Sequence, residues 1–378
     1  MIFWASIFGI VHTYLLYPLL LVPFRNRRTN IQEPTKWPST TLVIAAYNEE
    51  DVIKEKIENS LQLEYPDEQL DIIVFSDASS DRTDEIVRSY SDAGVRLMRI
   101  EGRVGKTKCQ NQVVSNVDTD FTVFSDANSM YEPDAIQKLI VQFSDDVGCV
   151  VGELRYRDDS DIEGESFYWK YEQFIKKLES RFNSLVTGNG SIYATRTSSY
   201  VPLPRDAISD FAEPLAIVQS GKLVKYAPDA VTWENTGNSV DSELSRRIRI
   251  VTRSWNTVAE YRGLLNPIHH PIFSFQLFSH KVLRWLSPLL LIGAFTSNVF
   301  LVALSSATFW VVLLSIQFGC YFLAILGWTT DQIDRSVPGI VHIPYYFTSA
   351  NYGMLVGFWN FLRGRNIVTW ETASRDMD

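Results

Sequence analysis

Residues 121–128 of the chain read Phe-Thr-Val-Phe-Ser-Asp-Ala-Asn, a largely apolar run that ends in a carboxylate and a carboxamide. The run Phe121–Ser125 is typical of a buried strand. Asp126 and Asn128 stand where that strand ends, and oxygen ligands at such a position suit a divalent metal that holds a diphosphate. The alternative interpretation is an Asx turn after the strand.

Short apolar runs alternate with helix-like stretches on both sides of this segment. Strands are predicted at residues 41–46, 71–76, 95–100, 121–125 and 148–151, and helices at 49–61, 83–90, 105–117 and 133–143. Near-continuous apolar strands separated by helices predict a parallel sheet covered on both faces. Further helices are predicted at 167–185, 207–220 and 242–262, and a strand at 192–194. The fold class is therefore α/β with a mostly parallel sheet.

Polar clusters follow three of the predicted strands, at residues 47–50, 77–81 and 126–128. The carboxyl ends of parallel strands meet at one edge of a sheet, where α/β proteins bind their ligands. Asp77 can accept a hydrogen bond from a base or a sugar hydroxyl. The alternative for its turn is a helix N-cap made by Asp81.

A basic turn, Arg103-Val104-Gly105-Lys106, precedes the predicted helix 105–117. A glycine-bounded turn at a helix N-terminus offers backbone N–H groups and, through Lys106, an ammonium to a phosphate. The spacing of a Walker loop is absent. A solvated basic loop is the alternative.

Two features of the second half bear on catalysis. Asp210 is a candidate general base for an attacking sugar hydroxyl, although taken alone it reads as an N-cap. Arg246, Arg249 and Arg253 are spaced to share one helix face. Bidentate guanidinium groups suit a diphosphate leaving group, and the alternative is a basic helix on a membrane surface.

Long uncharged stretches mark membrane segments. Residues 1–24 contain no Asp, Glu, Lys or Arg, and residues 286–330 contain no charged residue or His. At about 20 apolar residues per span, the first stretch fits one span and the second fits two. Residues 339–362 have span length but contain polar groups, so this segment either spans or re-enters. A cleaved signal peptide is disfavoured because no basic region precedes the first apolar run.

The chain divides accordingly into six parts. These are a transmembrane helix (1–24), a linker (25–39), a catalytic domain (40–262), an interfacial helical segment (263–284), a transmembrane region (285–362) and a tail (363–378). Basic residues flank the first and second spans on the side of the central domain, at Arg25, Arg27, Arg28, Lys281 and Arg284. They predict a cytoplasmic location for that domain in a multi-pass protein of the cell membrane. A net charge of −9 argues against general nucleic-acid binding.

Seven motifs follow one another in a fixed order. They read AAYNEE (45–50), SDASSDRT (76–83), GRVGKTKCQNQ (102–112), FSDANSMYEPDAI (124–136), TGNGSIYATR (187–196), SDFAEPL (209–215) and RRIRI (246–250). In this order the chain resembles the family 2 glycosyltransferases. It is most similar to the membrane-integrated branch that includes hyaluronan, chitin and cellulose synthases and related exopolysaccharide transferases.

The resemblance implies a GT-A fold, a nucleotide-sugar donor, Mg²⁺ or Mn²⁺ as cofactor, and inversion at the anomeric carbon. Asp126 and Asn128 match the two metal-binding positions of the DxD motif, and Asp210 matches the catalytic base. The resemblance also implies contacts to the nucleotide sugar from a larger set: Ala46, Glu49, Asp77, Lys106, Asp126, Arg246, Arg247, Arg249 and Trp255.

Three departures from the family pattern stand out. Asn128 replaces a charged metal ligand by an amide. The base motif reads SDF, without the preceding acid of the usual pair. RRIRI lacks the Gln and Trp of the QxxRW motif, for which Trp255 can partly substitute.

The expected function is transfer of a hexosyl or N-acetylhexosaminyl group from a nucleotide sugar, with UDP as the expected nucleotide. The acceptor is a glycan or a lipid-linked molecule at the cytoplasmic face of the bilayer, in polysaccharide or glycoconjugate biosynthesis. One alternative is transfer to polyprenyl phosphate, whose ionised acceptor needs no base. Another is a non-catalytic scaffold with a transferase-like domain.

Overall fold

The computed structural model describes residues 1–27, 34–157, 163–205, 207–235, 240–305, 307–333 and 339–365. Its centre is one eight-stranded sheet with the order β3-β2-β1-β4-β7-β6-β8-β5. The strands are β1 (Thr40–Ala46), β2 (Leu70–Asp77), β3 (Val95–Ile100), β4 (Phe121–Asp126), β5 (Met130–Tyr131), β6 (Val147–Tyr156), β7 (Ile192–Arg196) and β8 (Leu223–Glu234).

The direction of the strands divides the sheet. β1 pairs in parallel with β2 and β4, and β2 pairs in parallel with β3. β7 runs antiparallel to both β4 and β6, and β5 runs antiparallel to β8. β6 and β8 are again parallel to each other. The α/β class with a mostly parallel sheet is confirmed. The strands predicted up to residue 151 all run in one direction, and β7, which lies between β4 and β6, runs in the opposite direction.

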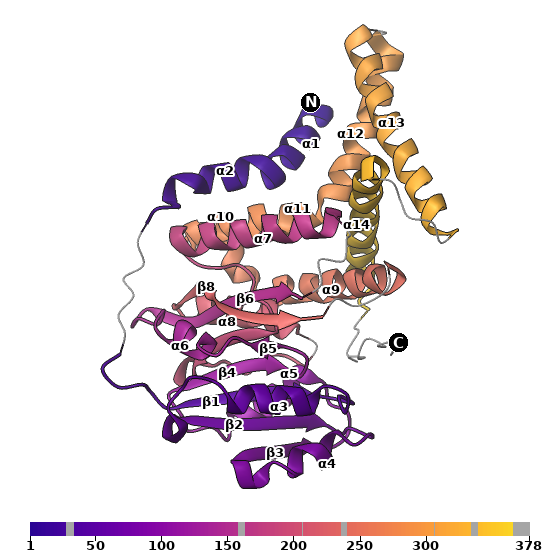
Figure 1. Cartoon of the computed structure of the whole chain (residues 1–378). Coiled ribbons are helices and arrows are strands. Elements are labelled where there is room, and N and C mark those ends of the chain that lie inside the picture. The colour runs from indigo at the N-terminus through magenta and orange to yellow at the C-terminus, as the bar shows by residue number, and fades with distance from the viewer. Residues whose placement is uncertain are drawn as a thin grey trace.

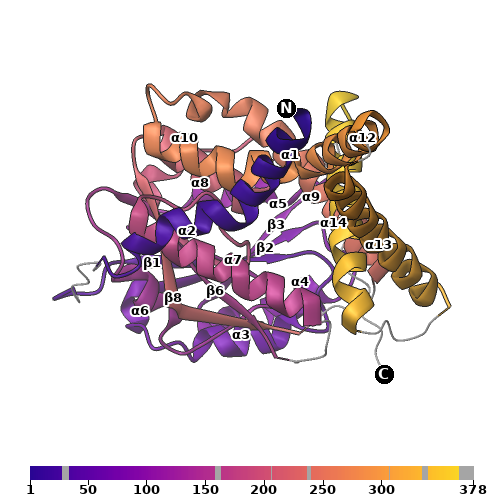
Figure 2. The ribbon, with the colours of Figure 1, turned by 90° about the horizontal axis from the view of Figure 1, so that it is seen from above.

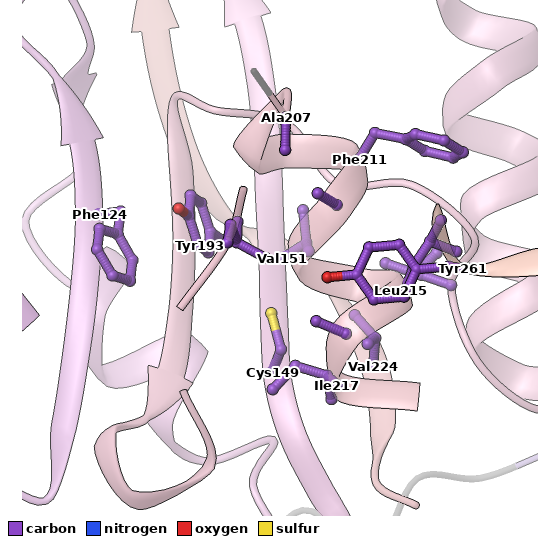
Figure 3. Packing of buried hydrophobic residues seen from close by; sticks show 14 of the residues in the cluster. Phe124, Cys149, Val151, Tyr193, Ala207, Phe211, Leu215, Ile217, Val224 and Tyr261 are labelled. Atoms are coloured by element: carbon purple, nitrogen blue, oxygen red, sulfur yellow. The ribbon is translucent and has the colours of Figure 1, made fainter. Parts of the chain in front are cut away.

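Helices cover both faces of the sheet. Around the sheet lie α3 (Ile53–Leu61), α4 (Thr83–Arg88), α5 (Lys106–Val114), α6 (Ala135–Ile140), α8 (Ser209–Gln219) and α9 (Val240–Glu260). One core lies between the sheet and α3, α4 and α6, and the other lies between the sheet and α5, α8 and α9. In the second core, α8 lies beside β6, which carries Cys149 and Val151, and the Phe211 ring of α8 points away from that strand (Figure 3).

The predicted strands are all present, with small differences in length. The helix predicted at 49–61 begins only at Ile53. The N–H groups of residues 48, 49 and 50 instead donate to side chains that follow β2, namely those of Ser79, Thr83 and Asp81. Strand β8 was not predicted, because its sequence lacks a clean alternation: buried and half-buried residues are mixed along its length.

Three helical segments are long and apolar enough to cross a membrane: Ile2–Phe24, Ser287–Ser305 and Thr308–Asp331. The first consists of α1 (Ile2–Val11), η1 (His12–Leu16), α2 (Tyr17–Leu21) and η2 (Val22–Phe24), and the others are α12 and α13. α14 (Gly339–Leu362) is a further helix, and it packs against α9 where Gly353 and Gly357 allow close approach to Arg247 and Val251. Beyond Arg365 the predicted tail lies outside the described residues.

A layer of helices separates the sheet from the apolar segments (Figure 1). This boundary layer consists of α7 (Glu163–Phe182), α10 (Pro271–Leu277), η7 (Phe278–Val282) and α11 (Leu283–Trp285). The N-terminal segment crosses over α7, as the view from above shows (Figure 2). The remaining short turns are η3 (Asp67–Gln69), η4 (Ser91–Ala93), η5 (Thr197–Ser199) and η6 (Arg262–Leu265).

Candidate active site

The loops that follow β1 and β2 hold each other in place. Asn48 adopts a left-handed φ of 51°, and its side-chain oxygen accepts a hydrogen bond of 2.8 Å from the N–H of Ser80. The N–H of Glu49 donates to the Thr83 hydroxyl at 2.8 Å. Glu49 is buried in this junction. The Ala46 side chain packs into the core, so this residue has only its backbone to offer a nucleotide.

Asp77 anchors the basic turn that begins at Gly102. Its two carboxylate oxygens accept hydrogen bonds from the N–H groups of Val104, at 2.8 Å, and Gly105, at 2.9 Å. The side chain is only 2% exposed. The guanidinium of Arg103 lies 3.1 Å from the centroid of the Tyr47 ring. Asp77, predicted to contact the nucleotide base, thus fixes the loop at the mouth of the predicted nucleotide site.

Three of the predicted residues meet around Gly190, in the turn before β7. Lys106, at the first position of α5, pairs with Asp126 at the end of β4. A Cβ placed on Gly190 would lie 3.2 Å from Lys106 Nζ, 3.7 Å from Asp126 Oδ2 and 4.0 Å from Asp210 Cβ. Lys106, Asp126 and Asp210 therefore lie close together, and a side chain at position 190 would crowd the Lys106 ammonium.

Asp210 lies in the first turn of α8, and its Oδ1 atom is buried without a hydrogen-bond partner among the described residues. Burial raises the pKa of this carboxyl, while Lys106 and Lys176 lower it; Asp126 raises it further. A carboxyl whose pKa is raised by burial, and whose Oδ1 atom has no hydrogen-bond partner among the described residues, is suited to accept a proton.

The turn after β4 is held from beneath by groups that the sequence analysis missed. Lys56 of α3 is fully buried and donates to the carbonyl of Ser129 at 2.5 Å, with Nζ 3.9 Å from the centroid of the Tyr131 ring. Burial lowers the pKa of Lys56 to about 7. Glu234 accepts hydrogen bonds of 2.5 Å from the hydroxyls of Ser129 and Ser191. The sequence feature that could have predicted this role is a lysine on the apolar face of a helix, between Ile53 and Ile57.

The donor set at the end of β4 suits a hard cation. Asp126 and the half-buried Asn128 offer carboxylate and amide oxygens, which Mg²⁺ and Mn²⁺ accept. The side chain of Asp126 pairs with the Lys106 ammonium, so a positive charge already stands at this position. Among the described residues no cluster of three or more His, Cys, Asp or Glu forms a metal site. Further ligands would have to come from a bound diphosphate and water.

The arginine helix is only partly directed toward this site. Arg253 donates to the carbonyl of Ala207 at 2.7 Å, just before α8, and acts electrostatically on Asp210. Arg247 instead donates to the Tyr346 hydroxyl of α14 at 2.8 Å. Arg246 is exposed and Arg249 is half-buried.

Trp255 packs among aromatic rings of α11 and α14. It is buried against the rings of Trp285, Phe358 and Phe361, with centroids 5.6, 5.1 and 5.8 Å away. The structure therefore brings Lys106, Asp126 and Asp210 together directly. A contact of Arg246, Arg247, Arg249 or Trp255 with the nucleotide sugar stays a prediction.

Comparisons with known proteins agree with this arrangement. Residues 41–199 match the family described as Glycosyl transferase family 2. The chain is 27% identical over 219 residues to a poly-beta-1,6-N-acetyl-D-glucosamine synthase of Staphylococcus aureus (strain MSSA476), an alignment that covers 55% of this chain and 53% of the relative. A synthase of the same description from Staphylococcus epidermidis is 24% identical over 256 residues, or 65% of this chain and 61% of the relative. The chain spans about half the length of the first of these curated relatives.

A solved structure extends the likeness to the whole chain. It is described as the mannosyltransferase PcManGT from Pyrobaculum calidifontis in complex with GDP-Man and Mn²⁺, and it superposes with a TM-score of 0.73 at 19% identity. The superposition covers 97% of this chain and 100% of the other. At this identity the likeness concerns the fold, and it confirms the predicted GT-A-like architecture.

Proposed function

We propose that this chain, which carries a glycosyltransferase family 2 domain, is a membrane-bound inverting enzyme that transfers a sugar from a nucleotide sugar to an acceptor hydroxyl. The observation that carries the proposal is the meeting of Asp210, Asp126 and Lys106 around Gly190. Displacement at an anomeric carbon needs a group that accepts the proton of the attacking hydroxyl and a cation that stabilises the leaving diphosphate. Asp210 and Lys106 are groups of these two kinds and lie close together.

The residues of the chain divide the chemistry between them. Asp210 takes the proton of the acceptor hydroxyl as the new C–O bond forms on one face of the sugar. On the opposite face the bond to the nucleoside diphosphate breaks, and the negative charge that develops there is stabilised by Lys106. Gly190 lies between these groups, and a Cβ there would already be only 3.2 Å from Lys106 Nζ.

Asp126 and Asn128 would hold Mg²⁺ or Mn²⁺ at the end of β4. The bound ion would neutralise charge on the diphosphate. Support comes from the oxygen donors at this strand end and from the fold neighbour, whose description includes Mn²⁺ and GDP-Man.

Donor, acceptor and membrane face are proposed from separate observations. The described activity of the staphylococcal relatives supports an N-acetylhexosamine donor and a glycan acceptor. UDP is proposed as the nucleotide from the resemblance of the motifs alone. The basic residues that flank the spans support a cytoplasmic site. The three apolar helices support attachment to the bilayer, with residues 263–284 as the proposed interfacial segment.

The test is turnover of a panel of nucleotide sugars by the purified full chain with Mn²⁺ or Mg²⁺, with nucleotide release and product size as readouts. We expect release of UDP from at least one UDP-sugar. Asp210→Asn should lower transfer by about 10²–10⁴-fold. Asp118→Asn, an exposed carboxylate before β4, is the matched control and should leave the rate unchanged.

Each result separates the alternatives. Transfer to a polyprenyl phosphate that survives Asp210→Asn would show that the acceptor is already ionised and needs no base. Metal-independent UDP binding without turnover of any donor would contradict the proposal and favour a non-catalytic scaffold.

A further inference from the structure

A small cavity lies beside the end of the first candidate span. Its volume is about 190 Å³, and its lining consists of Arg27, Asp146, Ser180, Arg181, Phe182, Asn183, Leu223 and Lys225. Arg27 is the third residue after the span Ile2–Phe24. The Phe182 ring at the end of α7 packs against the Phe24 ring, with centroids 4.5 Å apart. The cavity is therefore placed where the first span meets the boundary layer.

Positive charge exceeds negative charge in the lining. Arg27, Arg181 and Lys225 are cations, and Asp146 is the one carboxylate among the lining residues. Within the part of the chain that the structure describes, none of these three cations forms an ion pair. They donate instead to main-chain carbonyl oxygens, which belong to Phe182 for Arg27, to Arg25 for Arg181, and to Ser180 and Asn183 for Lys225. The carbonyls at the end of α7 contribute only about half a negative charge, so the lining stays positive.

The carboxylates next to the lining do not cancel this excess. Asp145 precedes Asp146 in the turn before β6, and the Lys222 ammonium donates to the carbonyl of Asp145 at 2.7 Å. Lys222 therefore offsets the charge of this second carboxylate. Glu179 of α7 is bound to side chains of the first span and of η7, and it is not part of the lining. With Lys222 and Asp145 included, four cations stand against two carboxylates.

The cavity is open to the surface of the molecule. Arg27, Arg181 and Asp146 are exposed, and Lys225 is half-buried. A water molecule needs roughly 10–15 Å³ of such space, so the cavity has room for a phosphate group. Each of the two guanidinium groups uses one nitrogen, Nη1, on a carbonyl. Their remaining N–H groups are donors of the kind that bind phosphate oxygens in pairs.

We propose that Arg27, Arg181 and Lys225 bind the phosphate group of an acidic phospholipid at the end of the first span. The phosphate groups of lipids lie just outside the hydrocarbon, at the level where spans end, and basic residues at this level attract anionic lipids. Arg27 follows the span and Arg181 belongs to α7, so a bound headgroup would hold these two parts of the chain together. Free phosphate has the same charge chemistry, and the experiment separates the two sources.

The experiment measures lipid binding to the purified full chain in a neutral detergent, by native mass spectrometry and by the shift of the thermal midpoint. The probes are phosphatidylglycerol, phosphatidylcholine and inorganic phosphate. We expect phosphatidylglycerol to bind at least about tenfold more tightly than phosphatidylcholine, because the choline group neutralises the phosphate of the latter. Inorganic phosphate should bind more weakly than phosphatidylglycerol, because it has no acyl chains to pack beside the span.

Variants with opposite expected effects separate binding from folding. The double variant Arg27→Ala with Arg181→Ala removes both exposed cations and should weaken phosphatidylglycerol binding at least about tenfold. Asp146→Asn removes the carboxylate of the lining and should strengthen this binding several-fold, a gain that a damaged fold would not produce. Arg262→Ala, at an exposed arginine outside the cavity, is the matched control and should bind phosphatidylglycerol like the unmodified chain.

Undiminished phosphatidylglycerol binding by the folded double variant, or equal binding of phosphatidylcholine, would overturn the site. An equal loss in Arg262→Ala would show that general surface charge attracts the lipid, and would overturn the assignment to the cavity. Equally tight binding of inorganic phosphate would overturn the assignment to a lipid. If the double variant does not fold, unchanged binding by Asp146→Asn overturns the site by itself. Turnover of a donor plays no part in these measurements, so the lipid site and the proposed function are tested separately.

Discussion

The edge of the sheet at β1, β2 and β4 and the boundary layer beneath the membrane helices both bury charged groups, but they do so in different ways. At the edge, Asp77 and Lys56 are bound to backbone groups of neighbouring loops. In the layer, Glu179 is bound to the side chains of Tyr17, at 2.5 Å, and His280, at 2.7 Å, which come from distant parts of the chain. The buried charged groups at the edge of the sheet therefore fix the loops of the candidate active site. Those in the boundary layer connect helices that are distant in the sequence.

This difference predicts that substitutions at the edge cost activity and substitutions in the layer cost stability. The largest effect is expected for Asp126→Ala. Loss of the carboxylate removes the charged metal ligand, so the transfer rate should fall by about 10³-fold or more at fixed Mn²⁺. The thermal midpoint should change little. A rate within a few-fold of the unmodified enzyme would contradict the proposed metal site.

The corresponding change in the layer is Glu172→Gln. Burial alone would raise the pKa of Glu172, but Lys281, Arg284 and His280 hold it well below its usual range. Removing the charge leaves two cations without their carboxylate and should cost about 3 kcal/mol or more. Thermal inactivation in detergent measures the effect. Glu85→Gln, on the sheet domain, serves as the control and should leave the thermal midpoint in place.

A third substitution tests whether Lys56, buried beside the turn after β4, positions the proposed metal ligands. Lys56→Met keeps the volume but removes the hydrogen bond to Ser129. The Mn²⁺ concentration needed for half-maximal activity should rise about tenfold, because outer-shell groups orient metal ligands. The maximal rate at saturating Mn²⁺ should recover. A lower maximal rate with an unchanged Mn²⁺ requirement would assign Lys56 to packing alone.

The last prediction concerns the pH dependence that arises from a carboxyl outside both regions. Glu213 of α8 is 1% exposed, its oxygens have no hydrogen-bond partner among the described residues, and burial raises its pKa from 4.5 to about 8. The unfolded chain loses this proton at lower pH than the folded chain. Stability should therefore fall as pH rises between these two values, by at most about 1.4 kcal/mol per pH unit from this group.

Glu213→Gln cannot ionise and should flatten this dependence. Thermal midpoints of both proteins between pH 5 and pH 8 check it. Parallel curves for the two proteins would show that Glu213 is already ionised in the folded chain.

Much of the sheet was predictable because its signals are local. Runs such as residues 42–46 are continuous apolar segments, and the polar residues directly after them fall at a common edge once the strands are parallel. The prediction missed β8 and the antiparallel insertion of β7, since pairing between strands of mixed burial depends on partners far along the chain. The role of Lys56 was missed for the same reason.

The sequence by itself determined the α/β class, the apolar helices and the chemical identities of Asp126, Lys106 and Asp210. These follow from periodicity, length and residue type, which are properties of neighbouring residues. Only the tertiary structure decided that these three side chains meet at Gly190, that Trp255 packs against α14, and that Arg284 is buried with unmet donors beside Glu172. Such juxtapositions join residues tens to more than a hundred positions apart, and packing between helices and the sheet, not local pattern, brings them together.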